Sequence, residues 1–367
     1  MADGPPMPPI PPREAEVARL LAAFAAAGAE PVSPEALQPA ETLLDLYGED
    51  IRARAYVVRE GYRERMLRPD FTVPVVRHHI RSGRAPARYA YAGPVWRRPA
   101  AGSDRPPETW QAGFEILGAT DPATADAEVF QLLTGLLPPG LTLATGDIGL
   151  LRAAVAALSV SPARQQALLR HIWRPHRFES LIERFSEPPR RKAARLRALA
   201  QDGAESLYAR AGKPVGLRSR AEVLARTEKL VAEAAEPPLA AAEIDLLKTI
   251  LTLSGTVADV AATLGEIARG APPLRPAADR FARRAEALAK RGMEPADLPF
   301  EGAFGRTTLE YYDGFVFGAL APGRPDLPVI AGGGRYDALT RALGQPIPAG
   351  GGIIRPEALL AMAGQEP

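Results

Sequence analysis

The pattern of apolar and polar positions predicts a long β-hairpin over residues 88–117. The segments 88–96 and 108–117 mix β-branched, aromatic and small residues, and the stretch between them is rich in Pro, Gly, Ser and Arg. This composition is typical of two strands joined by a loop. Arg97, Gln111 and Glu115 are polar residues in this otherwise half-buried pattern. Because burying an unpaired polar group is unfavourable, the hairpin either lines a ligand pocket or carries an ordinary polar outer face.

Upstream of the hairpin, the pattern changes from helical to extended. Apolar side chains at helical spacing over residues 12–27 predict a helix that ends at Gly28. Residues 30–32 are expected to be extended, and residues 34–47 to form a short irregular or helical segment.

A shorter hairpin is predicted over residues 55–68. It leads into the sequence LRPDFT, in which Pro69 fixes a turn and Thr72 is expected to cap a helix over residues 73–82. The carboxylate of Asp70 then has two interpretations: it accepts a hydrogen bond from a ligand ammonium, or it caps the same helix.

Helical periodicity dominates a region of the chain that we interpret as an insertion, residues 161–292. Before it, the pattern predicts a helix at residues 123–136, a strand at 142–146 and a helix at 150–158. A basic run inside the insertion belongs either to a solvated helix face or to a phosphate-binding surface. The run consists of Arg190, Arg191, Lys192, Arg195 and Arg197.

Strand character returns at residues 308–320 and 327–332. Glycine runs at 332–334 and 350–352 each precede a predicted helix. Neither run has the spacing of a P-loop or a dinucleotide-binding fingerprint. We therefore interpret these glycines as accommodating closely packed strands. The two helices are predicted at residues 337–343 and 357–363.

Composition and charge limit the partners and the metal sites that the chain is expected to have. The net charge of +2 is nearly balanced and gives no reason to expect nucleic-acid or membrane binding. With no cysteine and only four histidines, disulfides and thiolate metal sites are excluded, and we expect neither a metal nor a cofactor. Residues 1–11 are proline-rich and expected to be disordered. They lack the apolar run of a signal peptide, so a cytoplasmic location is expected.

Four separated stretches together resemble histidyl-tRNA synthetase: LRPDFT, YAGPVWR with ETWQAGFEILG, LEYYDGFVFGAL, and GGGRYDALTRALGQPIPAG. Their order and approximate spacing match that family. The resemblance implies an α+β fold of the class II aminoacyl-tRNA synthetase type, with a mostly antiparallel sheet, flanking helices and a dimer. It implies a core at residues 12–160 and 293–367, interrupted by the helical insertion at 161–292.

Departures from the synthetase pattern bear on function. Thr307, Ala358 and Pro99 stand where the resemblance implies a histidine-specific arginine, a phosphate-binding arginine and a glutamate. Because adenylation requires stabilisation of charge on phosphate, we expect this activity to be lost. The sequence also ends at Pro367, where a synthetase would continue, so we expect no anticodon-binding domain and no nucleic-acid partner.

The amino-acid side of the synthetase pocket is retained. The resemblance implies a histidine-binding site formed by Asp70, Thr72, Arg97, Gln111, Glu115, Tyr311, Tyr312 and Tyr336. A histidine site without adenylation residues resembles the regulatory subunits of ATP phosphoribosyltransferase. That family implies a non-catalytic subunit that dimerises within a hetero-oligomer, activates a short-form catalytic subunit, and carries histidine feedback in the first step of histidine biosynthesis.

Two alternatives remain open: an active histidyl-tRNA synthetase, and a synthetase-like module that binds tRNA or another protein. Thr307 and Ala358 argue against the first, and the nearly balanced charge argues against the second.

Overall fold

The computed structural model describes residues 12–40, 53–84, 86–99, 102–103, 105–186, 201–211, 218–307 and 311–364. The chain divides into two compact units. The first comprises Met1–Ala153 with Leu251–Pro367, and the second comprises Ala154–Ile250. Residues 1–11, for which the sequence predicts disorder, lie outside the described residues.

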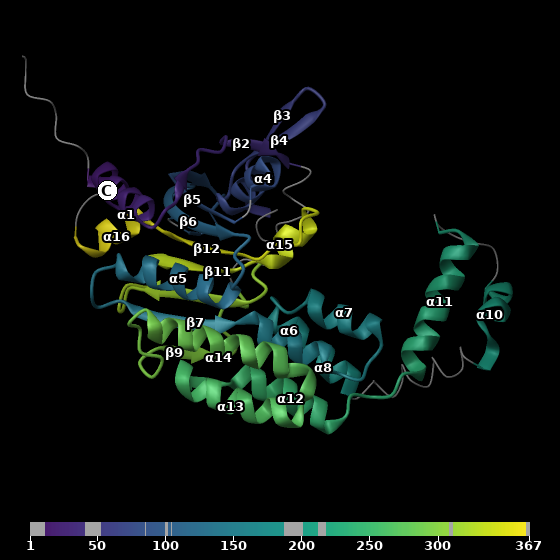
Figure 1. Cartoon of the computed structure of the whole chain (residues 1–367). Helices are drawn as coiled ribbons and strands as arrows, with labels where there is room; N and C mark the ends of the chain where they lie inside the picture. Colours follow the sequence, from purple (N-terminus) through teal and green to yellow (C-terminus); the bar gives the residue numbers. More distant parts are fainter. Residues whose placement is uncertain are drawn as a thin grey trace, which may run out of the picture. The chain divides into compact units, whose positions relative to one another are not determined.

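The described residues of the first unit form a nine-stranded sheet in the order β1-β5-β6-β12-β11-β10-β7-β9-β8 (Figure 1). Its strands pair antiparallel except that β1 is parallel to β5 and β7 is parallel to β9. The predicted α+β fold with a mostly antiparallel sheet is therefore confirmed. The strands are β1 Glu30–Pro31, β5 Ala87–Trp96, β6 Glu108–Leu117, β7 Thr142–Asp147, β8 Ser254–Thr256, β9 Pro299–Glu301, β10 Phe315–Leu320, β11 Ala331–Arg335 and β12 Ala349–Ile354.

Strands β5 and β6 pair along their whole length, which confirms the predicted long hairpin. In this register Tyr91 lies opposite Gly113, and Gly93 lies opposite Gln111. Alternate residues of a strand project to the same face. Gln111, Gly113 and Glu115 therefore share one face of β6, so the two polar residues singled out on this strand lie on the same side of the sheet.

A three-stranded sheet of the described residues has the order β2-β4-β3, with β2 Leu37–Pro39, β3 Val57–Glu60 and β4 Arg63–Leu67. Strands β3 and β4 confirm the shorter hairpin, and its turn contains Gly61 at a φ of 62°. Strand β2 differs from the irregular or helical segment predicted there, because its three residues pair with β4. Residues 41–52 lie outside the described part of the chain.

Helices cover both faces of the large sheet (Figure 1). A side chain at Gly352 would meet Leu133 of α5, whereas Glu115 lies over Gly351 and accepts a hydrogen bond from Thr72 of α4. Since adjacent strand residues point to opposite faces, α5 and α4 lie on opposite sides. The helices of this unit are α1 Pro12–Ala26, α4 Thr72–Ser82, α5 Pro122–Gly135, α13 Val257–Gly270, α14 Arg275–Lys290, α15 Asp337–Ala342 and α16 Pro356–Met362, and α6 Ile148–Ala156 continues into the second unit.

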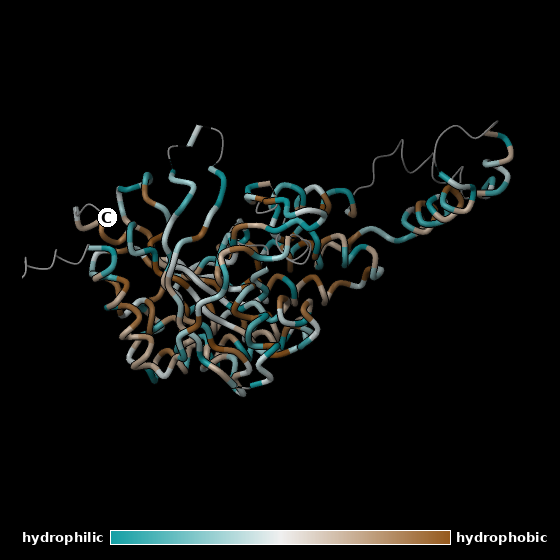
Figure 2. The backbone as a smooth tube through the Cα atoms, turned by 90° about the horizontal axis from the view of Figure 1, so that it is seen from above, coloured by the Kyte–Doolittle hydropathy of each residue, from teal (hydrophilic) through white to brown (hydrophobic). Residues whose placement is uncertain are grey.

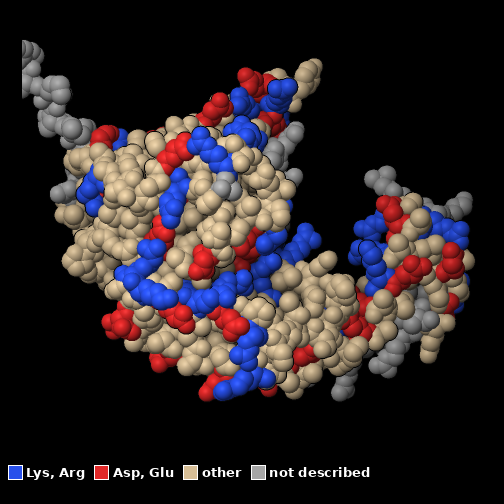
Figure 3. Space-filling model, viewed as in Figure 1, with Lys and Arg blue, Asp and Glu red and all other residues tan. Residues whose placement is uncertain are grey.

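The hydropathy of the chain follows this layering. Brown and teal segments alternate along the helices of the first unit in Figure 2, as expected for helices with one face against a sheet. Figure 3 shows basic and acidic residues interspersed on the visible surface of this unit, with a band of Lys and Arg bordered by Asp and Glu.

Both glycine runs lie inside strands. The sequence predicts a strand at residues 327–332, with the glycine run 332–334 leading on from it to a helix. In the structure the strand is β11, Ala331–Arg335, and it contains the whole glycine run. The second run lies within β12. A Cβ atom on Gly333 would collide with the Gly351 carbonyl oxygen. This confirms that the glycines permit close packing. Similarly, the strand expected at 308–320 is β10, Phe315–Leu320, and residues 308–310 lie outside the described residues.

Buried ion pairs tie the elements on the α5 side of the sheet. Arg335 of β11 pairs with Asp126 of α5 at 2.7 Å and with Asp337 at 2.9 Å. Arg284 of α14 pairs with Asp147 of β7 at 2.8 Å. Because both arginine side chains are at most 4% exposed, removing one partner would leave a buried charge uncompensated.

The second unit is helical in its described residues, with α7 Pro162–Arg170, α8 Pro175–Ser186, α10 Ala204–Arg210, α11 Arg220–Ala235 and α12 Ala241–Thr252, of which the last continues into the first unit. Its core includes Leu168, Phe178 and Phe185. A buried ion pair joins Arg164 to Glu236 at 3.1 Å. The basic run from Arg190 to Arg197 lies outside the described residues.

The helical insertion differs in extent from the expected 161–292. The second unit ends at Ile250, so α13 and α14 belong to the sheet-containing unit. The physical reason is the packing of α14 against α5 and the ion pair between Arg284 and Asp147. Helical periodicity alone does not reveal which core a helix joins.

The glycine packing gives a stability prediction. Gly333→Ala should lower the free energy of unfolding by roughly 1–3 kcal/mol, because overpacking displaces neighbouring backbone. The control is Gly265→Ala in α13, where nothing lies within 4 Å of the added Cβ, and a gain of roughly 0.5–1 kcal/mol is expected from helix propensity. Urea titration of both variants measures the difference, and equal effects of the two changes would contradict the packing argument.

Candidate functional site

The centre of the candidate site is the carboxylate of Glu115 on β6. Its Oε1 atom accepts hydrogen bonds from the hydroxyls of Thr72 at 3.0 Å and Tyr91 at 2.8 Å. Its Oε2 atom accepts a third hydrogen bond, from the Tyr336 hydroxyl at 2.5 Å. All four residues are buried. They come from α4, β5, β6 and the residue after β11, so segments far apart in the sequence converge on one carboxylate.

Two glycines make room for this cluster. The ring of Tyr91 occupies the position that a side chain at Gly113 would take, and the Glu115 carboxylate occupies the corresponding position at Gly351. Phe71 stacks on Tyr91, with ring centroids 4.4 Å apart and an interplanar angle of 13°. The ring of Tyr91 therefore lies between Gly113 of the sheet and the ring of Phe71.

Burial controls the protonation of the cluster. It raises the pKa of Glu115 to about 7, and Asp70 acts in the same direction, while the hydrogen bonds from the three hydroxyls oppose the shift. No Lys or Arg among the described residues forms an ion pair with this carboxylate. Burial and the charge of Glu115 raise the pKa of Tyr91 and Tyr336 well above the usual value, so both remain hydrogen-bond donors.

Thr72 does not cap α4, so that prediction is wrong. The N-cap residue is Phe71, and no side chain makes a capping hydrogen bond there. Thr72 is the first helical residue, and its hydroxyl donates to Glu115 instead. A threonine before an apolar run fits the pattern of a cap, but the tertiary acceptor that competes for its hydroxyl is not visible in local sequence.

Asp70, Tyr311 and Tyr312 lie at the border of the cluster around Glu115. Asp70 is 3% exposed and close enough to Glu115 to raise its pKa. Burial, Glu115 and Asp70 together raise the pKa of Tyr312. The ring of Tyr311 lies 5.0 Å from that of Tyr312 and 6.0 Å from that of Tyr336, measured between centroids.

Gln111 and Arg97 complete the predicted set. Gln111 is 3% exposed, and its Oε1 atom has no hydrogen-bond partner. A buried polar atom without a partner is uncommon in folded proteins and points to a missing ligand or water. Arg97 follows β5, and its Nε atom donates to the Pro69 carbonyl oxygen at 2.8 Å. The structure thus brings all eight predicted residues to one region of the sheet.

Two neighbours of the site were not singled out from the sequence. Tyr91 has no motif of its own, and its role depends on facing Gly113 across the hairpin. The alternation in YAYAG indicates a strand but does not identify the cross-strand partner. Arg355 follows β12 and interacts electrostatically with Arg97 and Tyr312. Only the observation that β12 ends beside β6 could have drawn attention to it.

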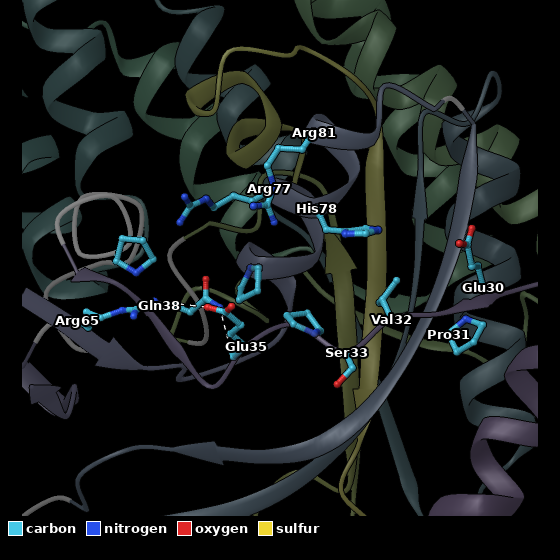
Figure 4. Close-up of a pocket in the computed structure, with 13 residues that line it drawn as sticks. Glu30, Pro31, Val32, Ser33, Glu35, Gln38, Arg65, Arg77, His78 and Arg81 are labelled. Atoms are coloured by element: carbon cyan, nitrogen blue, oxygen red, sulfur yellow. Dashed lines mark hydrogen bonds and ion pairs between the residues drawn. The ribbon is translucent and has the colours of Figure 1, made fainter.

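A separate cleft of about 440 Å³ lies between α4 and the segment from β1 to β2. Arg77 and His78 of α4 line it from one side, and Glu35 and Gln38 line it from the other (Figure 4). It contains none of the eight predicted site residues.

Within the described ranges, no group of three or more His, Asp or Glu side chains is arranged to hold a metal ion. In the same part of the chain, no helix is both long and apolar enough to cross a membrane.

Comparison with known proteins places this arrangement in a family. The sequence profile of the histidyl-tRNA synthetase family matches residues 10–249 and 221–359. A crystal structure from Bacillus halodurans, described as an ATP phosphoribosyltransferase regulatory subunit/histidyl-tRNA synthetase, covers 98% of this chain with a TM-score of 0.66, and 84% of that chain is covered. At 19% identity this likeness shows the fold.

Curated relatives identify the family more narrowly than the likeness in fold. The ATP phosphoribosyltransferase regulatory subunit of Agrobacterium fabrum is 34% identical over 95% of this chain and 96% of the relative. That of Brucella anthropi is 34% identical over 92% of this chain and 94% of the relative. The chain belongs to the ATP phosphoribosyltransferase regulatory subunit family. In this family member, Ala358 is buried in α16, and Thr307 is exposed next to the buried Arg306.

The raised pKa of Glu115 predicts a pH dependence of stability. The folded protein keeps a proton on Glu115 up to about pH 7, whereas the unfolded chain releases it near pH 4.5. The free energy of unfolding therefore falls as the pH rises from about 4.5 to 7. Glu115→Gln removes the ionisable group and with it this contribution to the pH dependence of stability. Relative to the parent, the variant should gain up to roughly 3 kcal/mol between pH 4.5 and pH 8.

Denaturant unfolding at several pH values measures this difference. The control is Glu30→Gln, because Glu30 pairs with Arg84 at 2.6 Å in an exposed position. A parallel pH profile for parent and Glu115→Gln would show that Glu115 is not the group responsible.

Proposed function

We propose that this chain is a non-catalytic regulatory subunit that activates a catalytic ATP phosphoribosyltransferase subunit of the short form and makes it sensitive to histidine. The names of the relatives support a regulatory role in histidine biosynthesis and a catalytic partner. The short form of that partner, dimerisation of this chain and histidine as ligand are parts of the proposal.

The buried cluster around Glu115 is the observation that best supports a histidine sensor. An imidazole ring offers two nitrogens that donate or accept hydrogen bonds. A carboxylate held by hydroxyls can accept from such a ring, and the hydroxyls of Tyr91 and Tyr336 stay protonated for the reasons given above. Under the proposal, the imidazole approaches Glu115 and the neighbouring tyrosines.

The α-amino group of the ligand also has acceptors under this proposal. Asp70 provides a buried carboxylate, and Gln111 provides the amide oxygen that has no partner in the structure. Hydrogen bonds between charged groups are stronger than neutral ones. The two acceptors therefore suit an ammonium group next to the imidazole site.

The proposal excludes adenylation by this chain. Ala358 and Thr307 replace residues expected to hold phosphate and histidine in a synthetase, and Ala358 is a small apolar residue buried in α16. Losing one donor to developing charge typically reduces the rate by about two to three orders of magnitude.

Reconstitution tests the regulatory role. Mixing the purified chain with a cognate short-form catalytic subunit should give a complex by light scattering, a gain in phosphoribosyltransferase activity, and inhibition by histidine. The catalytic subunit alone is the control. Neither complex nor gain in activity would remove the proposed partner, and histidine-dependent exchange between ATP and pyrophosphate by this chain would indicate a synthetase instead.

Variants test the histidine site. Gln111→Ala and Glu115→Ala should each weaken histidine binding at least about tenfold, because each leaves a charged or polar ligand group without its partner. Calorimetry measures the affinity. The matched control is Gln131→Ala in α5, on the opposite face of the sheet, which should bind histidine as the parent does.

Parent-like binding by both site variants would mean that the pocket is misplaced. Loss of binding with unchanged inhibition of the assembled enzyme would place the feedback site elsewhere.

A further inference from the structure

Arg355 is a half-buried cation near the predicted site. It follows β12 directly and precedes α16, and its Nη1 atom donates to the Val329 carbonyl oxygen. In the register of β12 with β6, Ile354 pairs with Ala112, so Arg355 lies next to Gln111. No Asp or Glu of the described ranges forms an ion pair with Arg355.

A second arginine, Arg97, interacts electrostatically with Arg355. Burial lowers the pKa of Arg355 to about 10, and the positive charges of Arg97 and Arg105 act in the same direction. Among the described residues, the side chain of Arg97 forms no ion pair, and its Nε atom donates to the Pro69 carbonyl oxygen. Adjacent guanidinium groups repel one another and lose hydration when buried. Their arrangement therefore favours an anion that the chain itself does not provide.

Tyr312 interacts electrostatically with groups of both charges. The pKa of this tyrosine is raised by burial and by the carboxylates of Glu115 and Asp70, whereas Arg355 opposes the shift. Tyr312 is thus close to both charged groups of the site. Gln111, with its unpartnered Oε1 atom, lies on the same sheet face next to Arg355.

The site therefore has two ends of opposite charge. Glu115 and the buried Asp70 form the acidic end, whereas Arg355 lies further along β6, level with Gln111, and interacts electrostatically with Arg97. An α-amino acid in its zwitterionic form has the matching separation of charge: an ammonium for the acidic end and a carboxylate for the basic end. A neutral ligand or a simple cation would leave the arginines unpaired.

We propose that Arg355, together with Arg97, binds the α-carboxylate of the amino-acid ligand. This rests on the proposed function, which places an amino acid in this pocket. Arg355 follows β12, whose own residues carry no polar side chains. It is a specificity-determining residue that distinguishes a free amino acid from analogues that lack the carboxylate.

Pairing a side-chain change with a ligand change tests this role. Affinities of the full-length parent and of Arg355→Gln are measured by calorimetry for histidine and for histidinol, in which a hydroxymethyl group replaces the carboxylate. The parent should bind histidine more tightly than histidinol. Arg355→Gln should lose roughly ten- to hundredfold affinity for histidine and little for histidinol, because only the carboxylate has lost its partner.

Two further variants sharpen the test. Arg98→Gln is the matched control, since Arg98 is an exposed neighbour of Arg97 that donates to the Ala55 carbonyl oxygen. It should leave both affinities unchanged. Arg355→Lys keeps the charge without the planar guanidinium, and it should retain part of the preference for histidine. This variant also keeps the proposal testable if Arg355→Gln does not fold.

The contrary outcomes are distinct. Equal losses for histidine and histidinol would overturn the proposal, because Arg355 would then shape the pocket without contacting the carboxylate. Pyrophosphate that binds through Arg355 without displacing histidine would also overturn it, since the arginines would serve a separate phosphate site. Failure of the parent to bind histidine at all would instead count against the proposed function.

Discussion

The candidate site depends on a sheet surface that carries almost no side chains. Gly113 and Gly351 lie on the face that bears Glu115, and they are covered by the side chains of Tyr91 and Glu115 respectively. A methyl group at either position would displace the polar group above it. The glycine runs thus have a role in positioning chemistry as well as in bringing strands together.

The opposite face of the same strands supplies rigidity. Arg335 ends β11, and its ion pairs with Asp126 and Asp337 fix the backbone on both sides of Tyr336. Asp337 also accepts a hydrogen bond from the backbone nitrogen of Ala349, at the start of β12. The tyrosine hydroxyl that reaches Glu115 is therefore positioned by charges on the far side of the sheet.

Much of the fold follows from local pattern, and the limits of that pattern are physical. The long hairpin was predictable because its strands alternate and its loop is rich in turn formers. The position of β11 was not, because three glycines carry no hydrophobic signal and form a strand only by pairing with β10 and β12. The end of the second compact unit could not be read from periodicity, because α14 has the same periodicity as the helices before it.

The site was predictable to a different degree. The residue pattern singled out Arg97, Gln111 and Glu115, and the resemblance to a family supplied the full set of eight. Local reasoning left Asp70 between two roles and assigned Thr72 the wrong one. Tyr91 and Arg355 escaped because their importance depends on register: Tyr91 faces Gly113 across the hairpin, and Arg355 lies next to Gln111 across β6 and β12. Register depends on how two strands pair and cannot be predicted from the sequence of either strand alone.

Electrostatics link the stability of the site to the proposed ligand. Glu115 and Asp70 are both buried, and the charge of Asp70 acts with burial to raise the pKa of Glu115. Under the proposal, the ammonium of the ligand binds Asp70 and Gln111, and its positive charge favours the ionised form of the carboxylates near it. At the basic end, a carboxylate would relieve the repulsion of Arg355 by Arg97. Under the proposal, one zwitterionic ligand therefore compensates both clusters of like charge, and its binding stabilises the folded subunit.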